Sequence, residues 1–307
     1  MALPTIDPLE SGIPPVRRSA QEAEALGFDG LWVGDHLFFH VPLLECLTTV
    51  GYALGATETL SVGTGVLLPA LREPVSLARQ LATLDVLSSG RLVIGVGVGG
   101  EFQPEWEAVN VDMRERGGRT DEFLSLWKRW CTGEPLTHDG RYWRLDTPPM
   151  RPLAPRENQA PVWIGGRSDA SLARTVRMRA GWLGMLASPR RVTEVGEQLH
   201  ALCAAEQVEP SPLGLIVFVN VGEPKKARAE LAAYVSANFR TPFEKLERWM
   251  VYGTSQQVAE QLTAYVKAGL DTVVIHAAAA EPRSQMGAIR EAVELAERAV
   301  AQGAEHA

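Results

Sequence analysis

The chain alternates between short runs rich in β-forming residues and longer stretches whose apolar residues recur every three or four positions. This alternation limits the possible folds more than any other feature. The clearest short runs are residues 28–33, 60–66, 91–98, 161–165, 181–185, 213–219 and 271–276. Several are apolar throughout, which is typical of parallel strands covered on both faces. A strand-helix unit repeated about eight times over roughly 250 residues predicts an α/β fold of the (β/α)8 TIM-barrel type.

The helical stretches between the runs support the same fold. The clearest is 74–87, where Pro74 stands in the first turn, a position that accepts proline. Residues 120–130 and 255–266 have the same spacing, and each opens with a Thr or Ser that could cap the helix. The eighth strand is expected to come first, within residues 1–6, and to be short. An open, doubly wound sheet is the competing architecture for this pattern.

Residues 133–160 interrupt the alternation. The segment is rich in proline, and its sequence HDGRYWRL predicts a small hairpin around Asp139 and Gly140. We expect this segment to be an insertion after the fourth barrel helix. Residues 1–307 are then expected to form a single domain.

Size and charge exclude several kinds of partner. A chain of 307 residues with 46% hydrophobic residues can bury a large core, and barrels of this length commonly form one domain. The net charge of −7 argues against a nucleic-acid partner. The apolar runs are too short to span a membrane, and the first residues lack the pattern of a secretion signal, so a cytoplasmic location is expected.

Candidate catalytic residues follow the strands, because active groups in such barrels lie at the C-terminal strand ends. Asp35 and His36 follow the second strand and form the best acid-base pair, since a neighbouring carboxylate can fix the histidine tautomer. A capping Asp beside a half-buried His is the alternative. Phe38, His40 and His276 are candidates for a substrate pocket, although His276 could equally be a packed core residue.

Two glycine-rich turns are candidate binding sites, and the second, at residues 165–168, could hold a phosphate group. The candidate cofactor-binding residues are Gly97, Val98, Gly99, Gly100 and Glu101 after the fourth strand, and Gly165, Gly166, Arg167 and Ser168 after the fifth. Repeated glycine in a strand indicates close backbone approach or a bulge, and N–H groups at a helix start attract anions. A plain turn capped by Ser168 and a solvated Glu101 are the alternatives. No residue spacing typical of a metal site occurs, so no metal is expected.

Several segments together resemble the bacterial luciferase-like family of flavin and deazaflavin oxidoreductases. They are ALGFDGLWVGDH (25–36), VGTGVLLPALREPVSLARQLATLDVLSSG (62–90), RLVIGVGVGGE (91–101), ERGGRTDE (115–122), PVWIGGRSDASLA (161–173) and YGTSQQVAEQL (252–262). The run from Arg72 to Gly99 is the most specific. The resemblance implies the barrel fold, a redox function and a flavin or deazaflavin cofactor.

The family includes enzymes that use reduced FMN with oxygen and enzymes that use coenzyme F420, a deazaflavin, for hydride transfer. The compact chain and the Asp35-His36 pair favour coenzyme F420 and a small organic substrate. An FMN-dependent monooxygenase with a separate flavin reductase is the alternative, and a non-redox barrel enzyme or a ligand-binding protein is a more distant one. Some deazaflavin sugar-phosphate dehydrogenases carry a Trp where this chain has Phe38, Phe39 and His40, which counts against a sugar phosphate.

The resemblance also implies how the site is built. Gly65 and Val66 are expected to form a non-prolyl cis peptide at a bulge behind the cofactor ring. The phosphate chain is expected to meet the turns 97–100 and 165–168. His36 would move a proton, with Asp35 orienting it. Relatives usually pair through early helices, so the apolar segment 43–56 predicts a homodimer.

Overall fold

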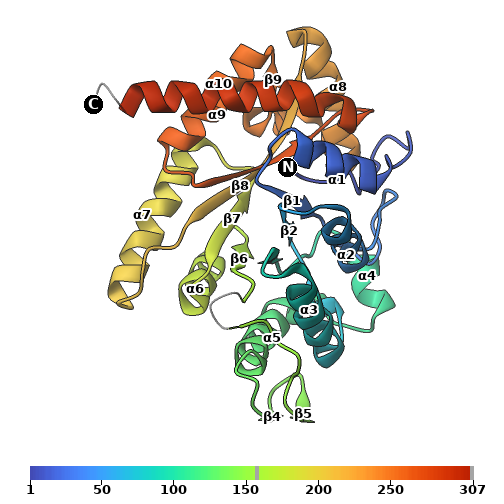
Figure 1. Cartoon of the computed structure of the whole chain (residues 1–307), viewed down its shortest axis with the longest axis vertical. Helices are drawn as coiled ribbons and strands as arrows, with labels where there is room; N and C mark the ends of the chain where they lie inside the picture. The colour runs from blue at the N-terminus through green and yellow to red at the C-terminus, as the bar shows by residue number, and fades with distance from the viewer. Residues whose placement is uncertain (156–158, 305–307) are drawn as a thin grey trace.

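The computed structural model describes residues 1–155 and 159–304, and a parallel sheet forms its centre (Figure 1). Neighbouring strands run in the order β1-β2-β3-β6-β7-β8-β10, and each adjacent pair is parallel. The strands are β1 (Gly30–Val33), β2 (Ser61–Thr64), β3 (Leu92–Val96), β6 (Val162–Gly165), β7 (Gly181–Met185), β8 (Leu213–Val221) and β10 (Thr272–Ala277). A short strand, β9 (Val251–Gly253), also pairs with β8. Each of the seven predicted runs contains one strand of this order or overlaps it.

The first residues of the chain close the sheet into a barrel. The Ala2 amide donates to the carbonyl of Ile275 in β10 at 2.7 Å, and the Leu3 amide donates to the carbonyl of Trp32 in β1 at 2.8 Å. Ala2 therefore lies between the two edges of the sheet, in parallel register with Trp32. The first residues thus take the place of the predicted short first strand through an isolated bridge at Ala2, and the open doubly wound sheet is wrong.

Helices connect the strands and lie around them (Figure 1). They are α1 (Val16–Ala25), α2 (Cys46–Ala56), α3 (Pro74–Ser88), α4 (Gln103–Ala108), α5 (Arg116–Trp130), α6 (Asp169–Met178), α7 (Pro189–Ala205), α8 (Pro224–Phe239), α9 (Ser255–Lys267) and α10 (Met286–Ala304). Short 3-10 turns are η1 (Pro69–Leu71), η2 (Met113–Glu115), η4 (Phe243–Lys245), η5 (Glu247–Trp249) and η6 (Pro282–Gln285). In residues 1–155 and 159–304, no helix combines the length and the apolar character that a membrane crossing needs.

Two helices begin differently from the prediction. Helix α5 starts at Arg116, and the hydroxyl of Thr120, the expected cap, donates instead to the Arg116 carbonyl at 2.8 Å inside the helix. Helix α9 is capped by Thr254, one residue before the expected Ser255. The Thr254 hydroxyl accepts from the Gln257 amide, and the Gln257 side chain accepts from the Thr254 amide, which forms a capping box. Pro74 does begin α3, as predicted.

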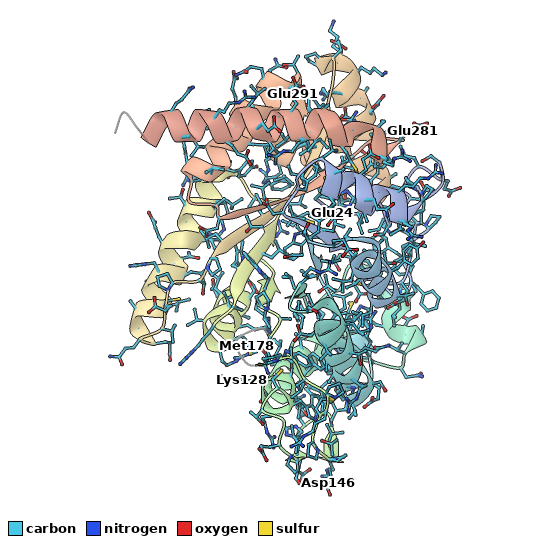
Figure 2. All side chains as sticks on the ribbon, viewed as in Figure 1. Glu24, Lys128, Asp146, Met178, Glu281 and Glu291 are labelled. Carbon is cyan, nitrogen blue, oxygen red and sulfur yellow. The ribbon has the colours of Figure 1, made fainter. Side chains whose placement is uncertain are left out.

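The predicted hairpin is confirmed between α5 and β6. Strands β4 (Leu136–Asp139) and β5 (Arg144–Thr147) pair in antiparallel register. Glu122 of α5 accepts from the backbone amides of Tyr142 and Trp143 at 3.1 and 3.0 Å, which fixes the turn to the helix. The hairpin, which includes Asp146, lies at the end of the molecule opposite α10 (Figures 1 and 2). That residues 133–160 are an insertion stays a prediction, and residues 156–158 lie outside the described residues.

Candidate functional site

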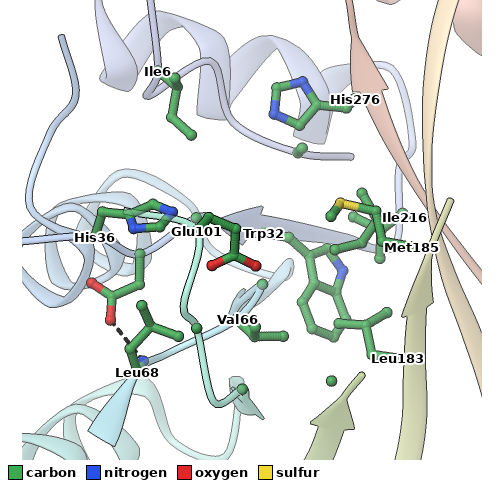
Figure 3. Close-up of a pocket in the computed structure, with 18 of the residues that line it drawn as sticks. Ile6, Trp32, His36, Val66, Leu68, Glu101, Leu183, Met185, Ile216 and His276 are labelled. Atoms are coloured by element: carbon green, nitrogen blue, oxygen red, sulfur yellow. Dashed lines mark hydrogen bonds between the residues drawn. The ribbon is translucent and has the colours of Figure 1, made fainter. Parts of the chain in front are cut away.

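A cavity of about 360 Å³ lies where the parallel strands end (Figure 3). Most of its wall is apolar, and Trp32, Val66, Leu183 and Ile216 contribute large surfaces. Of the residues predicted from the sequence, it is lined by Asp35, His36, His40, Gly65, Val66, Gly97, Val98, Gly99, Glu101, Gly165, Gly166, Arg167 and His276. The structure therefore brings together residues that come from most of the barrel strands.

Three predicted residues lie outside the lining of this cavity. Phe38 is 57% exposed and does not line this cavity. Its neighbour Phe39 lines the cavity instead and stacks on His36 with 4.2 Å between ring centroids. Ser168 caps α6 by accepting from the Ser171 amide at 3.3 Å, which agrees with the alternative of a plain turn capped by Ser168. Gly100 faces Arg116 rather than the cavity.

The peptide bond between Gly65 and Val66 is cis, as the resemblance implied. The Val66 side chain enters the cavity from this bulge (Figure 3). Glycines on the next strands make room for it. A Cβ on Gly97 would lie 2.4 Å from a methyl carbon of Val66, and one on Gly165 would lie 3.1 Å from the other methyl carbon. The repeated glycines therefore leave room for the Val66 side chain to pack closely, and they also keep the cavity open.

The ring of His36 is held by Glu105, a residue that the sequence did not single out. The Nδ1 atom of His36 lies 3.0 Å from one carboxylate oxygen of Glu105 and 3.2 Å from the other. Glu105 is fully buried and also accepts from the Leu37 amide at 3.2 Å. A carboxylate at Nδ1 favours the tautomer with its proton there. The other ring nitrogen, Nε2, has no hydrogen-bond partner in the described residues and is free to meet a ligand.

Asp35 binds the segment that follows β2 rather than the His36 ring. Its two carboxylate oxygens accept from the Arg72 guanidinium at 2.7 Å each. One of them also accepts from the Leu68 amide at 2.8 Å, the bond that is dashed in Figure 3. Burial raises the pKa of the Asp35 carboxyl, and Arg72 opposes this effect. Asp35 and His36 form no hydrogen bond with each other in the described residues, because Glu105 holds Nδ1 of His36 and Asp35 binds Arg72 and Leu68. Asp35 instead fixes the chain that follows β2 beneath the cavity.

Glu105 could have been suspected only from its place in the chain. It lies in α4, in the segment that follows the glycine turn after β3. The neighbouring Trp106 is 1% exposed and packs with Leu68 and Leu71, which holds the short helix against the barrel end. The signal in the sequence was a Glu followed by a Trp shortly after a strand end.

Two further histidines contact the cavity from different sides. His276 of β10 stacks on Phe218 with 4.9 Å between ring centroids, and its ring lies 5.9 Å from that of Tyr234. Burial lowers the pKa of His276 to about 4, so this ring is neutral near pH 7. His40 lies 3.2 Å through Nε2 from the Ala237 carbonyl in the last turn of α8. His276 is therefore both a packed core residue and part of the cavity wall.

Two arginines near the glycine turns are free of acidic partners in the described part of the chain. Arg167 lines the cavity at the start of α6, where helix N–H groups also favour an anion. The Nε atom of Arg116 is buried, and no atom of residues 1–155 or 159–304 forms a hydrogen bond with it. A Cβ on Gly100, whose φ is +116°, would lie 3.1 Å from that atom. This region has the charge and the open backbone that a phosphate group needs.

The family model described as Luciferase-like monooxygenase matches residues 5–272. The chain belongs to this family. It is an oxidoreductase of the luciferase-like type, with the barrel fold that the resemblance implied.

Individual relatives agree with this assignment. The chain is 26% identical over 293 residues to an F420-dependent glucose-6-phosphate dehydrogenase from Kineococcus radiotolerans, covering 84% of this chain and 85% of that protein. It spans about half the length of several other curated relatives that it matches. A solved F420-dependent secondary alcohol dehydrogenase in complex with an F420-acetone adduct has a TM-score of 0.82 at 18% identity and covers 96% of this chain and 97% of its own. The monooxygenase RslO1 from Streptomyces bottropensis has a TM-score of 0.83 at 19% identity, with 96% and 98% covered.

Proposed function

We propose that this protein transfers a hydride between coenzyme F420 and a small organic substrate, with His36 as the proton carrier. The observation that carries the proposal is the contact between His36 and Glu105, which leaves Nε2 of His36 as a free basic atom at the cavity. The F420-dependent dehydrogenases among the relatives support the choice of cofactor.

The residues present fit a cofactor that carries a phosphate group. The buried, unpartnered Nε of Arg116 and the cation of Arg167 lie beside the two glycine turns, and Arg167 is positioned at a helix start. Charge-assisted bonds from arginine suit a phosphate. Val66 would support the ring from the bulge between β2 and η1. When bound, coenzyme F420 would supply the atom that accepts or donates the hydride.

The chain's own residues would manage the proton. During oxidation of an alcohol, the C–H bond yields the hydride, and the O–H proton passes to Nε2 of His36 as the C=O bond forms. Glu105 keeps the proton of Nδ1 in place and stabilises the imidazolium. In the reverse direction, His36 returns the proton to the oxygen. The apolar wall limits the access of water to these groups.

An FMN-dependent monooxygenase with a separate flavin reductase is the second candidate, and the description of the matching family, Luciferase-like monooxygenase, favours it. Titration of the purified protein with coenzyme F420 and with FMN separates the two. We expect the dissociation constant for coenzyme F420 to be at least about tenfold lower, a free-energy difference near 1.4 kcal/mol. Tighter binding of FMN, with oxygen consumed when reduced FMN is supplied, would instead support the monooxygenase.

A homodimer through the early helices is also proposed. Tyr52 of α2 is 55% exposed on the outer side of that helix, while Val50 and Ala53 face the barrel. An exposed aromatic side chain on a helix of this kind suits a two-fold contact. Sedimentation at micromolar concentration is expected to show twice the chain mass of 33.4 kDa. A species of the single-chain mass would contradict this proposal.

A further inference from the structure

Asn238 is a buried polar residue without a hydrogen-bond partner in the described residues. It lies at the end of α8, is 8% exposed and lines the cavity. The end of α8 is fixed toward the cavity because the Ala237 carbonyl lies 3.2 Å from Nε2 of His40. A ligand that displaces water from this amide must supply a hydrogen-bond partner in its place, or binding loses free energy. Asn238 therefore points to a polar group on a ligand.

His276 lies in the same part of the wall. Its ring stacks on Phe218 of β8 and lies next to Tyr234, which is one helical turn before Asn238 in α8. Neither ring nitrogen of His276 has a hydrogen-bond partner in residues 1–155 and 159–304. Figure 3 shows His276 and Ile6 across the open space from Val66 and Leu68. Asn238 and His276 are polar side chains of this part of the wall, together with His40, which contacts the Ala237 carbonyl.

The same wall is poor in positive charge. Among the lining residues that the structure describes, Arg167 is the only Lys or Arg, and it lies at the glycine turn of β6. The wall around Asn238 is completed by apolar residues such as Phe239, Met185 and Leu186. A phosphate or carboxylate on the substrate would lose its hydration there without gaining a cation in exchange.

We infer that Asn238 and His276 recognise the substrate, and that the substrate is an uncharged, largely apolar molecule with a second polar group, a hydroxyl or carbonyl, away from its reacting carbon. The inference rests on the proposed function, because that function places the cofactor ring on the Val66 side and the reacting oxygen at His36. Asn238 can donate to and accept from the second group. Neutral His276 offers one donor and one acceptor beside it.

Binding of two matched probes tests the inference. Cyclohexanol has one hydroxyl, and trans-1,4-cyclohexanediol has a second one at the far side of the same ring. Calorimetric titration of the protein saturated with coenzyme F420 is expected to give a dissociation constant about tenfold lower for the diol, the gain of one hydrogen bond. The ratio is expected to fall to about one in Asn238→Leu and to shrink in His276→Phe, which keeps the stacked ring. Asn238→Ser keeps a polar group and is expected to retain part of the preference.

Several results would overturn the inference. They are an unchanged ratio in Asn238→Leu, tighter binding of glucose 6-phosphate than of either neutral probe, and no binding of the neutral probes. If Asn238→Leu does not fold, the other two variants decide. An unchanged ratio of the two dissociation constants in both His276→Phe and Asn238→Ser would then overturn the inference. Failure of the proposed function would be visible separately, because coenzyme F420 alone would then not bind. The probes would in that case be titrated into the free protein, whose Asn238 side chain is the same.

Discussion

Nδ1 of His36 lies 3.0 Å from the buried carboxylate of Glu105, which stands 69 residues later in the chain. This contact joins the loop after β1 to the short helix α4 after β3. It gives the cavity a histidine whose orientation is fixed and whose second nitrogen is available.

Glu105→Gln is expected to lower kcat by roughly 10 to 10²-fold, because an amide neither fixes the tautomer of His36 as firmly nor stabilises its protonated form. Steady-state rates at saturating cofactor measure this. Glu107→Gln, on the exposed side of the same helix, is the matched control and should leave kcat unchanged. Equal rates for wild type and Glu105→Gln would show that the carboxylate has no part in turnover.

His36→Ala is expected to lower kcat by roughly 10² to 10⁴-fold, the usual range for a positioned acid-base group. The dissociation constant for the cofactor should stay nearly the same. His40→Ala removes the contact with the Ala237 carbonyl, so it should mainly raise the substrate KM and lower the melting temperature. If His36→Ala only lowers the melting temperature and turns over normally, His36 is a packing residue.

Arg167→Ala and Arg116→Ala are each expected to raise the cofactor dissociation constant by roughly 10 to 10²-fold, since each removes a charge-assisted bond to a phosphate. The kcat at saturating cofactor should change little, because the phosphate does not react. Arg114→Ala is the control. Arg114 is highly exposed and pairs with Asp112, so its loss should not affect the titration. An unaltered dissociation constant in both test variants would mean that the phosphate binds elsewhere.

Gly97→Ala is expected to weaken cofactor binding and to destabilise the fold by about 1–3 kcal/mol, because the new methyl group would lie 2.4 Å from a methyl carbon of Val66. Chemical denaturation measures the second effect. Adding Val66→Ala to this variant should restore part of the stability by removing the clash. Gly287→Ala in α10, where a Cβ meets nothing within 4 Å, should be neutral or stabilising. A fully stable Gly97→Ala protein with normal cofactor affinity would contradict the close packing.

Asp85→Asn is expected to raise the melting temperature at pH 7 to 8. Burial raises the pKa of the Asp85 carboxyl, and one of its oxygens has no hydrogen-bond partner in the described residues while the other accepts from the Ala160 amide at 3.3 Å. A raised pKa in the folded state means that stability is lost as the pH rises through that value. The advantage of Asn should therefore shrink on acidification toward pH 4. A constant advantage at every pH would exclude ionisation as the cause.

The fold was predictable because its signals are local. Each parallel strand is a short apolar run, and each helix has a regular apolar spacing, so the order of elements can be found without any long-range contact. Even the closing strand at Ala2 was expected from the count of strands. The capping error at Thr120 has a local cause too, since a Thr side chain can also bond back to a carbonyl within a helix.

The site was less predictable because its partners are far apart in the chain. Asp35 directly precedes His36, yet Arg72 and Leu68 bind its carboxylate, and Glu105 reaches the histidine from another loop. The sequence does not show which of Phe38 and Phe39 lines the cavity, because apolar residues have no regular spacing in the loop between β1 and α2. The cis peptide at Gly65 was expected only from the resemblance.

The position of Asn238 and Phe239 as the last two residues of α8 has a practical consequence. Both line the cavity from a helix end, whereas the phosphate region is built by glycines in strands and turns on other parts of the barrel. Directed evolution toward a new substrate should therefore begin by randomising codons 238 and 239. Such a library changes the chemistry that meets the substrate and leaves untouched the strand positions where even one added methyl group is expected to disturb Val66.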